Sequence, residues 1–440
     1  MKRRLKAALG LFSGGVGVLV SGAAAAQLLT IAAAPILTRL YGPEDFGILA
    51  VFTALISMIT VVASFRYEMA IPLPKEDDEA ASILAISLII LLFVIILAFI
   101  IVNIGGQYIL KFLDAKDLST YIYLIPIGVA TAGFYQIFHR WSIRSKKFSN
   151  IASTRILQSI GTTSIQVLGF KFGTISLLLG YALGQGLGAA KLANVRGTIG
   201  LLKKVSIKEC LYSARKYKEF PIYATWTGLL NSASLQLAPV IFVFFYGSSA
   251  AGLYALTHRV LSIPANLIGS AVGSVFISEA PDAKRKGKLA ILVHELHYRL
   301  TLIATLPLIV VLAAGPSLFS LVFGHEWKTA GVYAQVMAPW LYTQFKWTPL
   351  SSLALVLELQ RELLVADVLL FFARLASIYF SWLFFSDIFI TIACFSLTSA
   401  CLYAVRTAWF LDKSGSKFRV GIGYDVVIIL VSSTFIALNI

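Results

Sequence analysis

Three basic residues lie deep inside long apolar segments. Residues of this type in such a position are suited to bind anions. Arg259, Lys346 and Arg374 lack an obvious carboxylate at the same depth. At about 1.5 Å per helical residue, they lie ~15, ~25 and ~17 Å, respectively, from one end of their predicted helices. Unpaired buried cations are costly, and arginine binds phosphate through paired N–H donors. We therefore expect them to line a cavity for an anionic substrate; the alternative is that backbone carbonyls or neighbouring helices satisfy them.

A second group of ionisable residues lies nearer the ends of the predicted helices. Arg66 and Glu68 stand near the inner end of the second helix, and Arg155 stands near the inner end of the fifth. Glu68 is expected to pair with Arg66 or Arg155, which makes Glu68 and Arg155 gate or coupling candidates. A structural ion pair is preferred for Arg66, which is also a substrate-binding candidate. Asp367, a further gate candidate, shares a helix with Arg374 but lies about two turns away, too far for direct contact.

The segments that must position these residues have the length of membrane spans. The chain of 440 residues is 58% hydrophobic and 13% charged, whereas a soluble domain carries roughly 25% charged residues. Apolar stretches of about 20 residues cross the hydrocarbon core as helices. The sequence therefore predicts an all-α polytopic membrane protein with twelve core spans, at Leu11–Thr38, Phe46–Ile71, Ala80–Ile104, Leu118–Trp141, Ser149–Phe170, Thr174–Ala193, Pro221–Tyr246, Ala250–Ser278, Ile291–Phe323, Thr329–Leu357, Leu363–Phe385 and Ile388–Phe410.

One more apolar run follows the twelve spans. It extends from Val420 to Ile440 and is apolar except for Asp425. We expect a thirteenth span here, and the alternative is a helix that lies on the membrane surface. At the other end of the chain, residues 1–27 resemble a secretory signal, but the apolar run continues to Leu37 and favours a first span instead.

The distribution of lysine and arginine predicts a cytoplasmic N-terminus. In that orientation the basic residues concentrate on the inner side, as the positive-inside rule requires. The outer segments hold only Arg39, Lys111, Lys116, Lys171 and Lys328. This bias explains the net charge of +16, so nucleic acid is not expected as a partner.

An internal repeat predicts two lobes. "APILTRLYGPEDFGILA" (Ala34–Ala50) and "APVIFVFFYGSSAAGLYA" (Ala238–Ala255) share a Tyr-Gly-x-x-x-x-Gly frame. The copies are six spans apart, so they keep the same orientation, as in a parallel repeat about an axis along the membrane normal. We expect two six-helix bundles: an N-lobe at 1–200 and a C-lobe at 221–411, with a cytoplasmic amphipathic linker at 201–220 and the extra helix at 420–440.

The repeat adds three candidates for substrate binding. Gln27 and Asn231 are polar residues at matched positions, eight residues before the proline that the copies share. Arg39 lies in the outer hairpin of the first copy, where the second copy carries no charge. Gly42 and Pro43 are expected to turn this hairpin and to begin the next helix, whose first turn is acidic.

No pattern in the sequence supports enzyme chemistry. It contains no nucleotide-binding loop, catalytic triad or cluster of metal ligands, and its cysteines, Cys210, Cys394 and Cys401, form no CxxC pair. We expect a protein that is not an enzyme, with no catalytic residue, metal or cofactor.

The motifs resemble those of one family. "LTRLYGPEDFGILAVF", "FRYEMAIPLPKEDDEA" (Phe65–Ala80) and the basic segment "HRWSIRSKKFSNIASTRILQS" (His139–Ser159) are similar to Wzx-type oligosaccharide flippases. These belong to the multidrug/oligosaccharidyl-lipid/polysaccharide (MOP) superfamily. The resemblance implies two six-helix bundles in a V shape around a central cavity, as in multidrug extruders. It implies as substrate an oligosaccharide linked to undecaprenyl pyrophosphate, moved across a bacterial inner membrane by alternating access, with H⁺ or Na⁺ coupling.

The residue pattern and the family resemblance together lead us to expect a flippase for lipid-linked units of O-antigen or a related surface polysaccharide. Arg259, Lys346 and Arg374 attract the pyrophosphate or acidic sugars, Arg66 and Glu68 shape the cytoplasmic mouth, and Arg39 lies at the periplasmic rim. Other polysaccharide-assembly proteins are expected as partners in the bilayer, and the chain is expected to be a monomer.

Two rival functions stay open. A cation-coupled drug extruder on the same fold predicts acidic residues deep in the N-lobe, where the sequence offers only Glu68. A membrane glycosyltransferase or polymerase predicts large outer loops with catalytic residues. The longest outer loop here, near Gly105–Asp117, contains no such constellation.

Overall fold

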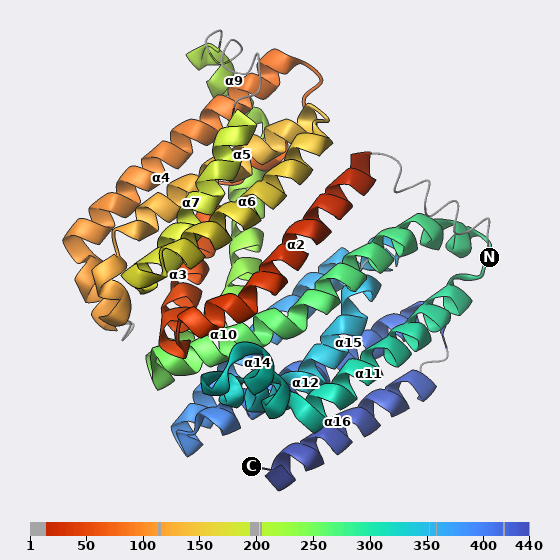
Figure 1. Cartoon of the computed structure of the whole chain (residues 1–440). Coiled ribbons are helices and arrows are strands. Elements are labelled where there is room, and N and C mark those ends of the chain that lie inside the picture. Colours follow the sequence, from red (N-terminus) through yellow and green to blue (C-terminus); the bar gives the residue numbers. More distant parts are fainter. Residues whose placement is uncertain are drawn as a thin grey trace. The chain divides into compact units, whose positions relative to one another are not determined.

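The computed structural model describes residues 15–112, 116–193, 202, 205–351, 353–357, 359–416 and 419–439. Every regular element within these residues is helical (Figure 1), which confirms the predicted all-α class. The start of the first predicted span (11–14) and the predicted boundary at 200–201 lie outside the described residues. The chain divides into two compact units, Met1–Gly252 and Leu253–Ile440. The predicted limits of the lobes stay predictions.

The first unit is a bundle in which α7 packs against both α5 and α6, α6 also packs against α2, and α4 packs against α5. Its elements are α2 (Gly15–Leu40), α3 (Pro43–Val62), η1 (Tyr67–Ala70), α4 (Asp77–Phe112), η2 (Lys116–Tyr121), α5 (Leu124–Arg144), α6 (Phe148–Leu168), η3 (Phe170–Phe172), α7 (Thr174–Ala193), α9 (Ile207–Lys216), η4 (Phe220–Ala224) and the beginning of α10 (Thr225–Arg285).

The second unit is built around α12, which packs against α11, α15 and α16. Most residues of α12 are buried, and α14 covers α15 on another side. The unit contains the rest of α10, then α11 (Leu289–Phe323), η5 (His325–Trp327), α12 (Lys328–Leu350), α13 (Leu353–Leu357), α14 (Gln360–Phe385), α15 (Ile388–Lys413) and α16 (Arg419–Asn439).

The helices follow the predicted spans. Eight helical segments among the described residues are long and apolar enough to cross a membrane, and one of them, Phe220–Ile263, contains the seventh predicted span and the first part of the eighth. α5, α6 and α12 are also long but more polar, and they bury much of that polarity. Gln158 and Gln166 of α6 and Lys346 of α12 are buried. The predicted polytopic membrane protein is therefore confirmed, and these three polar residues are packed inside the units.

The chain turns between α2 and α3 as the residue types predict. Pro43 is the first residue of α3, and the backbone N–H of Gly42 donates to Asp45 Oδ2 at 3.0 Å. Proline suits this position because the first N–H groups of a helix have no partner within it, and an acidic first turn complements the helix dipole. The hydroxyl of Thr174, at the start of α7, also donates to Asp45. Asp45 is thus a capping residue that joins α3 to α7.

The second copy of the repeat lies inside α10. Gly247 has φ +84° and ψ 171°, which interrupts the helical backbone between two helical segments. A positive φ favours glycine because the Cβ of any other residue would crowd the backbone there. This break corresponds to the boundary between the seventh and eighth predicted spans, and Gly247 is the match of Gly42 in the first copy.

The final apolar run forms α16, which packs against α11, α12 and α15. Its single acidic residue, Asp425, is 1% exposed, because α16 turns that side chain into the second unit. The helix is therefore a packed part of this unit. Its predicted passage across the membrane stays a prediction.

Candidate functional site

Arg374 is the most enclosed of the predicted arginine ligands. It lies on α14 with 6% of its surface exposed, and its Nε donates to Ser399 Oγ of α15 at 2.8 Å. Its guanidinium carbon lies 5.0 Å from the ring centre of Trp340, 5.3 Å from Phe395 and 5.6 Å from Tyr403. Nη2 has no hydrogen-bond partner among the described residues.

This environment stabilises the charge without neutralising it. The negative faces of aromatic rings attract a guanidinium, and the attraction grows when water is excluded. His258 of α10 extends the aromatic group, because it stacks on Trp340 at 5.3 Å and on Tyr254 at 6.0 Å. The arrangement therefore presents a buried cation with an unused donor, and its chemistry is the binding of an anion.

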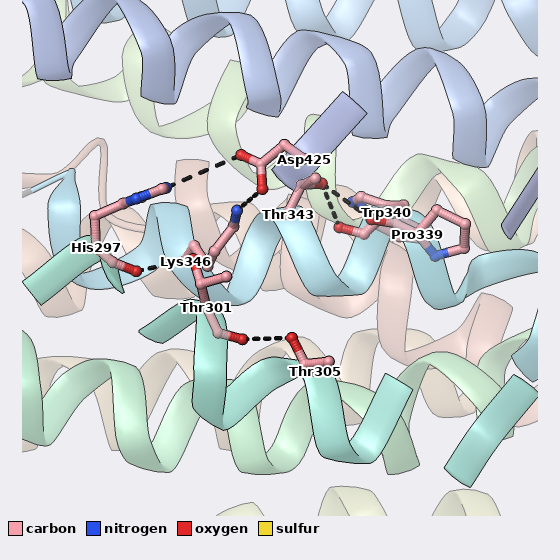
Figure 2. Close-up of polar contacts among 8 residues, drawn as sticks. All are labelled: His297, Thr301, Thr305, Pro339, Trp340, Thr343, Lys346 and Asp425. Atoms are coloured by element: carbon pink, nitrogen blue, oxygen red, sulfur yellow. Dashed lines mark hydrogen bonds and ion pairs between the residues drawn. The ribbon is translucent and has the colours of Figure 1, made fainter. Parts of the chain in front are cut away.

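Lys346 has a carboxylate partner, so the prediction that it lacks one is wrong. Its Nζ forms an ion pair with Asp425 of α16 (Figure 2). The two side chains are 0% and 1% exposed. Nζ also lies 4.4 Å from the ring centre of Tyr342. His297 of α11 places Nε2 4.0 Å from Asp425 Oδ2. An ion pair presents no free charge, so Lys346 is not equivalent to Arg374.

Sequence reasoning missed this pair because its members are 79 residues apart. Asp425 also lies after the twelve predicted core spans, in the apolar run from Val420 to Ile440. The available signal was Asp425 itself, because an ionisable residue alone in an apolar helix requires a partner in the membrane.

Glu68 is the centre of a polar group in the first unit. It is 0% exposed, Ser64 Oγ donates to its Oε2 at 2.5 Å and Gln136 Nε2 of α5 donates to its Oε1 at 2.6 Å. Arg66 Nη1 lies 3.7 Å from Oε1. Of the two partners that the sequence left open for Glu68, Arg66 is the one in contact, and Gln136 is a partner that sequence reasoning missed.

The backbone at this group is unusual. Phe65 and Arg66 both have positive φ, 45° and 60°, a conformation that costs free energy in residues other than glycine. The turn brings Arg66 against Gly228 of α10, so closely that a Cβ at Gly228 would overlap the guanidinium. The group thus connects η1, α5 and the start of α10 within the first unit.

Arg155 and Asp367 have partners of their own. The guanidinium carbon of Arg155 lies 5.5 Å from the ring centre of Tyr135, and the Arg155 residue is exposed. Asp367 Oδ1 accepts from Arg406 Nη2 at 2.8 Å, which joins α14 to α15. Their predicted roles in gating or coupling stay predictions.

The remaining candidates are more accessible. Arg39 at the end of α2, Asn231 and Arg259 of α10 are exposed, and Gln27 of α2 is half-buried. The structure therefore encloses Arg374 and Lys346 and leaves Arg259 accessible. Among the described residues, no group of three His, Cys, Asp or Glu could hold a metal ion.

The comparison with protein families decides the classification. Residues 36–331 match the model of the family described as "Polysaccharide biosynthesis protein". The chain belongs to the polysaccharide biosynthesis protein family. The match includes both copies of the glycine frame and the Arg66–Glu68 turn, so it covers the motifs from which the resemblance to Wzx-type flippases was inferred. No curated protein matches this polysaccharide biosynthesis protein by sequence.

Solved structures confirm the fold of this family member. A lipid II flippase, MurJ, in an inward closed conformation aligns with a TM-score of 0.68 at 12% identity, over 98% of this chain and 99% of that one. An inward-facing multidrug resistance MATE transporter of the MOP superfamily aligns with a TM-score of 0.63 at 12% identity, over 90% and 94%. A point mutant of the MATE transporter VcmN from Vibrio cholerae aligns with a TM-score of 0.55 at 13% identity, over 94% and 98%.

The family match and the shared fold agree with the resemblance to Wzx-type flippases, because MurJ and a MATE transporter of the MOP superfamily have the same fold. The apolar helices make this chain a multi-pass membrane protein. Identities this low establish the shared fold and do not transfer a substrate.

Proposed function

We propose that the protein flips undecaprenyl-pyrophosphate-linked oligosaccharide repeat units from the cytoplasmic to the periplasmic leaflet of a bacterial inner membrane. The family description supports a role in polysaccharide biosynthesis. The shared fold with a lipid II flippase supports a lipid-linked substrate, since lipid II is named as the substrate of that protein. In this proposal the N-terminus is cytoplasmic, and transport proceeds by alternating access with H⁺ or Na⁺ coupling.

The observation that carries the proposal is the buried guanidinium of Arg374 with its unpartnered Nη2 among the described residues. A diphosphate offers the charge and the acceptor oxygens that such a donor lacks. The exposed Arg259 is assigned to the same substrate. Lys346 is left out of the substrate site, because Asp425 already neutralises it.

The group around Glu68 is assigned to the cytoplasmic mouth. Glu68 is a fully buried carboxylate with two hydrogen-bond donors and one nearby arginine. Such a group is suited to couple a cation to movement of the η1 turn, because protonation would remove the attraction to Arg66. Arg39 is assigned to the periplasmic rim, and Gln27 and Asn231 to contacts with the sugars.

The test is complementation of surface polysaccharide in cells that lack the protein. Arg374→Ala should abolish the polysaccharide while the protein stays in the membrane, and Arg374→Lys should restore little because a point charge lacks the planar fork. Arg299→Ala is the matched control, since Arg299 is 69% exposed in its pair with Glu295, and it should retain normal polysaccharide. Normal polysaccharide with Arg374→Ala would refute the assignment of Arg374.

The second candidate is a cation-coupled exporter of small molecules. It is favoured by the fold shared with a multidrug MATE transporter and by the buried acid Glu68 in the first unit. Mass spectrometry of lipids that copurify with the protein separates the two functions. A polyprenyl-pyrophosphate glycan supports the flippase, and its absence together with drug efflux by the protein supports the exporter.

A further inference from the structure

The short helix α9 is attached to the first unit by one face. Its start is fixed by a reciprocal capping pair, in which Ser206 and Glu209 each accept a backbone N–H of the other, at 3.4 and 3.0 Å. Ser213 is 1% exposed on the attached face. Tyr217, just beyond the helix, donates its hydroxyl to Glu79 of α4 at 3.2 Å.

Two further contacts hold α9 in place. Lys216 Nζ lies 2.5 Å from Glu79 Oε1. The hydroxyl of Tyr67, in η1, donates to the backbone carbonyl of Ala214 at 3.0 Å. α9 therefore contacts Tyr67, the residue between Arg66 and Glu68.

The rest of α9 presents an apolar strip beside a basic strip. Ile207 and Leu211 are 87% and 57% exposed, and at about 100° per residue they lie roughly 40° apart around the helix. Lys208 and Arg215 are also exposed, and they lie some 40–60° beyond Leu211 on the side away from the attached face. This order of strips is typical of helices that lie in a membrane interface, with apolar side chains toward the acyl region and cations toward the headgroups.

The position of α9 agrees with that interpretation. Glu79, its main anchor, belongs to the first turn of α4, and the apolar span of α4 follows immediately. α9 is therefore held at the level where a membrane-crossing helix begins. At this level two exposed aliphatic side chains meet the boundary between headgroups and acyl chains, and the neighbouring cations meet phosphate.

We propose that α9 binds the phosphate headgroups of anionic lipids through Lys208 and Arg215, with Ile207 and Leu211 inserted at the acyl boundary. Binding holds α9 against α4 and, through the bond from Tyr67 to Ala214, holds the η1 turn that carries Arg66 and Glu68. Charge complementarity selects this occupant, because both cations lie beside the apolar strip while Glu209 lies on the far side of the helix.

The test is hydrogen exchange of residues 207–216 in the full protein in nanodiscs, made of phosphatidylcholine alone or with phosphatidylglycerol added. Exchange should slow at least about fivefold in the anionic nanodiscs, the factor expected from one basic residue at an anionic surface, and the difference should shrink at high salt. Lys208→Gln/Arg215→Gln should remove the difference. Lys286→Gln/Lys288→Gln, exposed lysines elsewhere, should preserve it.

Three outcomes would overturn the proposal. Equal exchange in the two kinds of nanodisc would show that α9 does not distinguish lipid charge. Slowing that depends on protein concentration would identify a second copy as the occupant. If anionic lipid still slowed hydrogen exchange in Lys208→Gln/Arg215→Gln, the lipid would be bound by a site other than these two residues. None of these measurements requires transport, so the proposal stands or fails independently of the flippase function.

Discussion

Gly47 of α3 and Gly252 of α10 pack backbone against backbone: a Cβ on Gly252 would lie 2.7 Å from the backbone nitrogen of Gly47. The contact is reciprocal, because a Cβ on Gly47 would overlap the carbonyl oxygen of Ser248, and one on Gly252 would overlap that of Pro43. The two glycines occupy matched positions in the internal repeat. The repeated glycine frame thus serves to bring its own two copies together.

Replacing either glycine by alanine should destabilise the protein by about 1–3 kcal/mol, the usual cost of an extra methyl group in a packed site. Both near neighbours are backbone atoms, which cannot move aside as a side chain would. Thermal unfolding in detergent measures the effect. Gly105→Ala is the control, since apart from its chain neighbours and the adjoining helix backbone no atom lies within 4 Å of its Cβ position, and it should be neutral or slightly stabilising. Unchanged unfolding of Gly47→Ala and Gly252→Ala would contradict the contact.

The ion pair of Lys346 and Asp425 provides a second prediction. Asp425→Asn leaves the buried ammonium without its counter-ion and should cost about 3–5 kcal/mol. The double variant Lys346→Met/Asp425→Leu removes both charges and should recover most of the stability, because apolar replacements of a buried pair are often neutral. The measurement is thermal unfolding of each variant.

An exposed pair is the control for this experiment. Arg299 and Glu295 are 69% and 54% exposed, so Glu295→Gln should cost less than about 1 kcal/mol. A large loss in Glu295→Gln, or a double variant no more stable than Asp425→Asn, would speak against the buried pair as the source of the effect.

The fold was predictable from the sequence to the extent that it depends on local pattern. Apolar length predicts the helices, and Gly42 with Pro43 predicts the turn before α3. The contact of Gly47 with Gly252 and the pair of Lys346 with Asp425 were not predictable, because they join distant segments and depend on how the helices pack. A repeat shows that two segments are alike, and it does not show that they touch.

The candidate site was predictable in its residue types and only partly in its geometry. Distance along a helix is a property of one segment and can be estimated from the sequence, but it does not decide burial, because Arg374 is buried and Arg259 is exposed. Which faces of other helices surround Arg374 is decided by packing, so the aromatic rings of Trp340 and Phe395 had no signal in the sequence. For the same reason the sequence does not identify Gln136, which lies on a different helix, as a hydrogen-bond donor to Glu68.

Gln136 should contribute to stability through the buried carboxylate. Gln136→Leu leaves Glu68 Oε1 without its 2.6 Å donor and should cost roughly 1.5–3 kcal/mol, as for a hydrogen bond to a charged group. In the background of Glu68→Met the same change should cost much less, because the charge is gone. A double-mutant cycle by thermal unfolding measures the coupling, and additive effects would show that the two side chains do not interact.

The reactivity of Cys210 reports whether α9 stays attached. Burial against α4, and secondarily the charge of Glu209, raise the pKa of the Cys210 thiol. A raised pKa means less thiolate at neutral pH, so alkylation should be slower than for a free cysteine. The pH at which the alkylation rate reaches half of its maximum should lie above the ordinary thiol pKa of about 8.5. The measurement is the labelling rate against pH in Cys394→Ala/Cys401→Ala, where Cys210 alone remains.

Glu209→Gln keeps the capping bonds and removes the charge, so it should lower the midpoint pH of labelling but leave it raised by burial. Denatured protein should label with the ordinary midpoint, and an ordinary midpoint in the folded protein would mean that α9 is detached from α4.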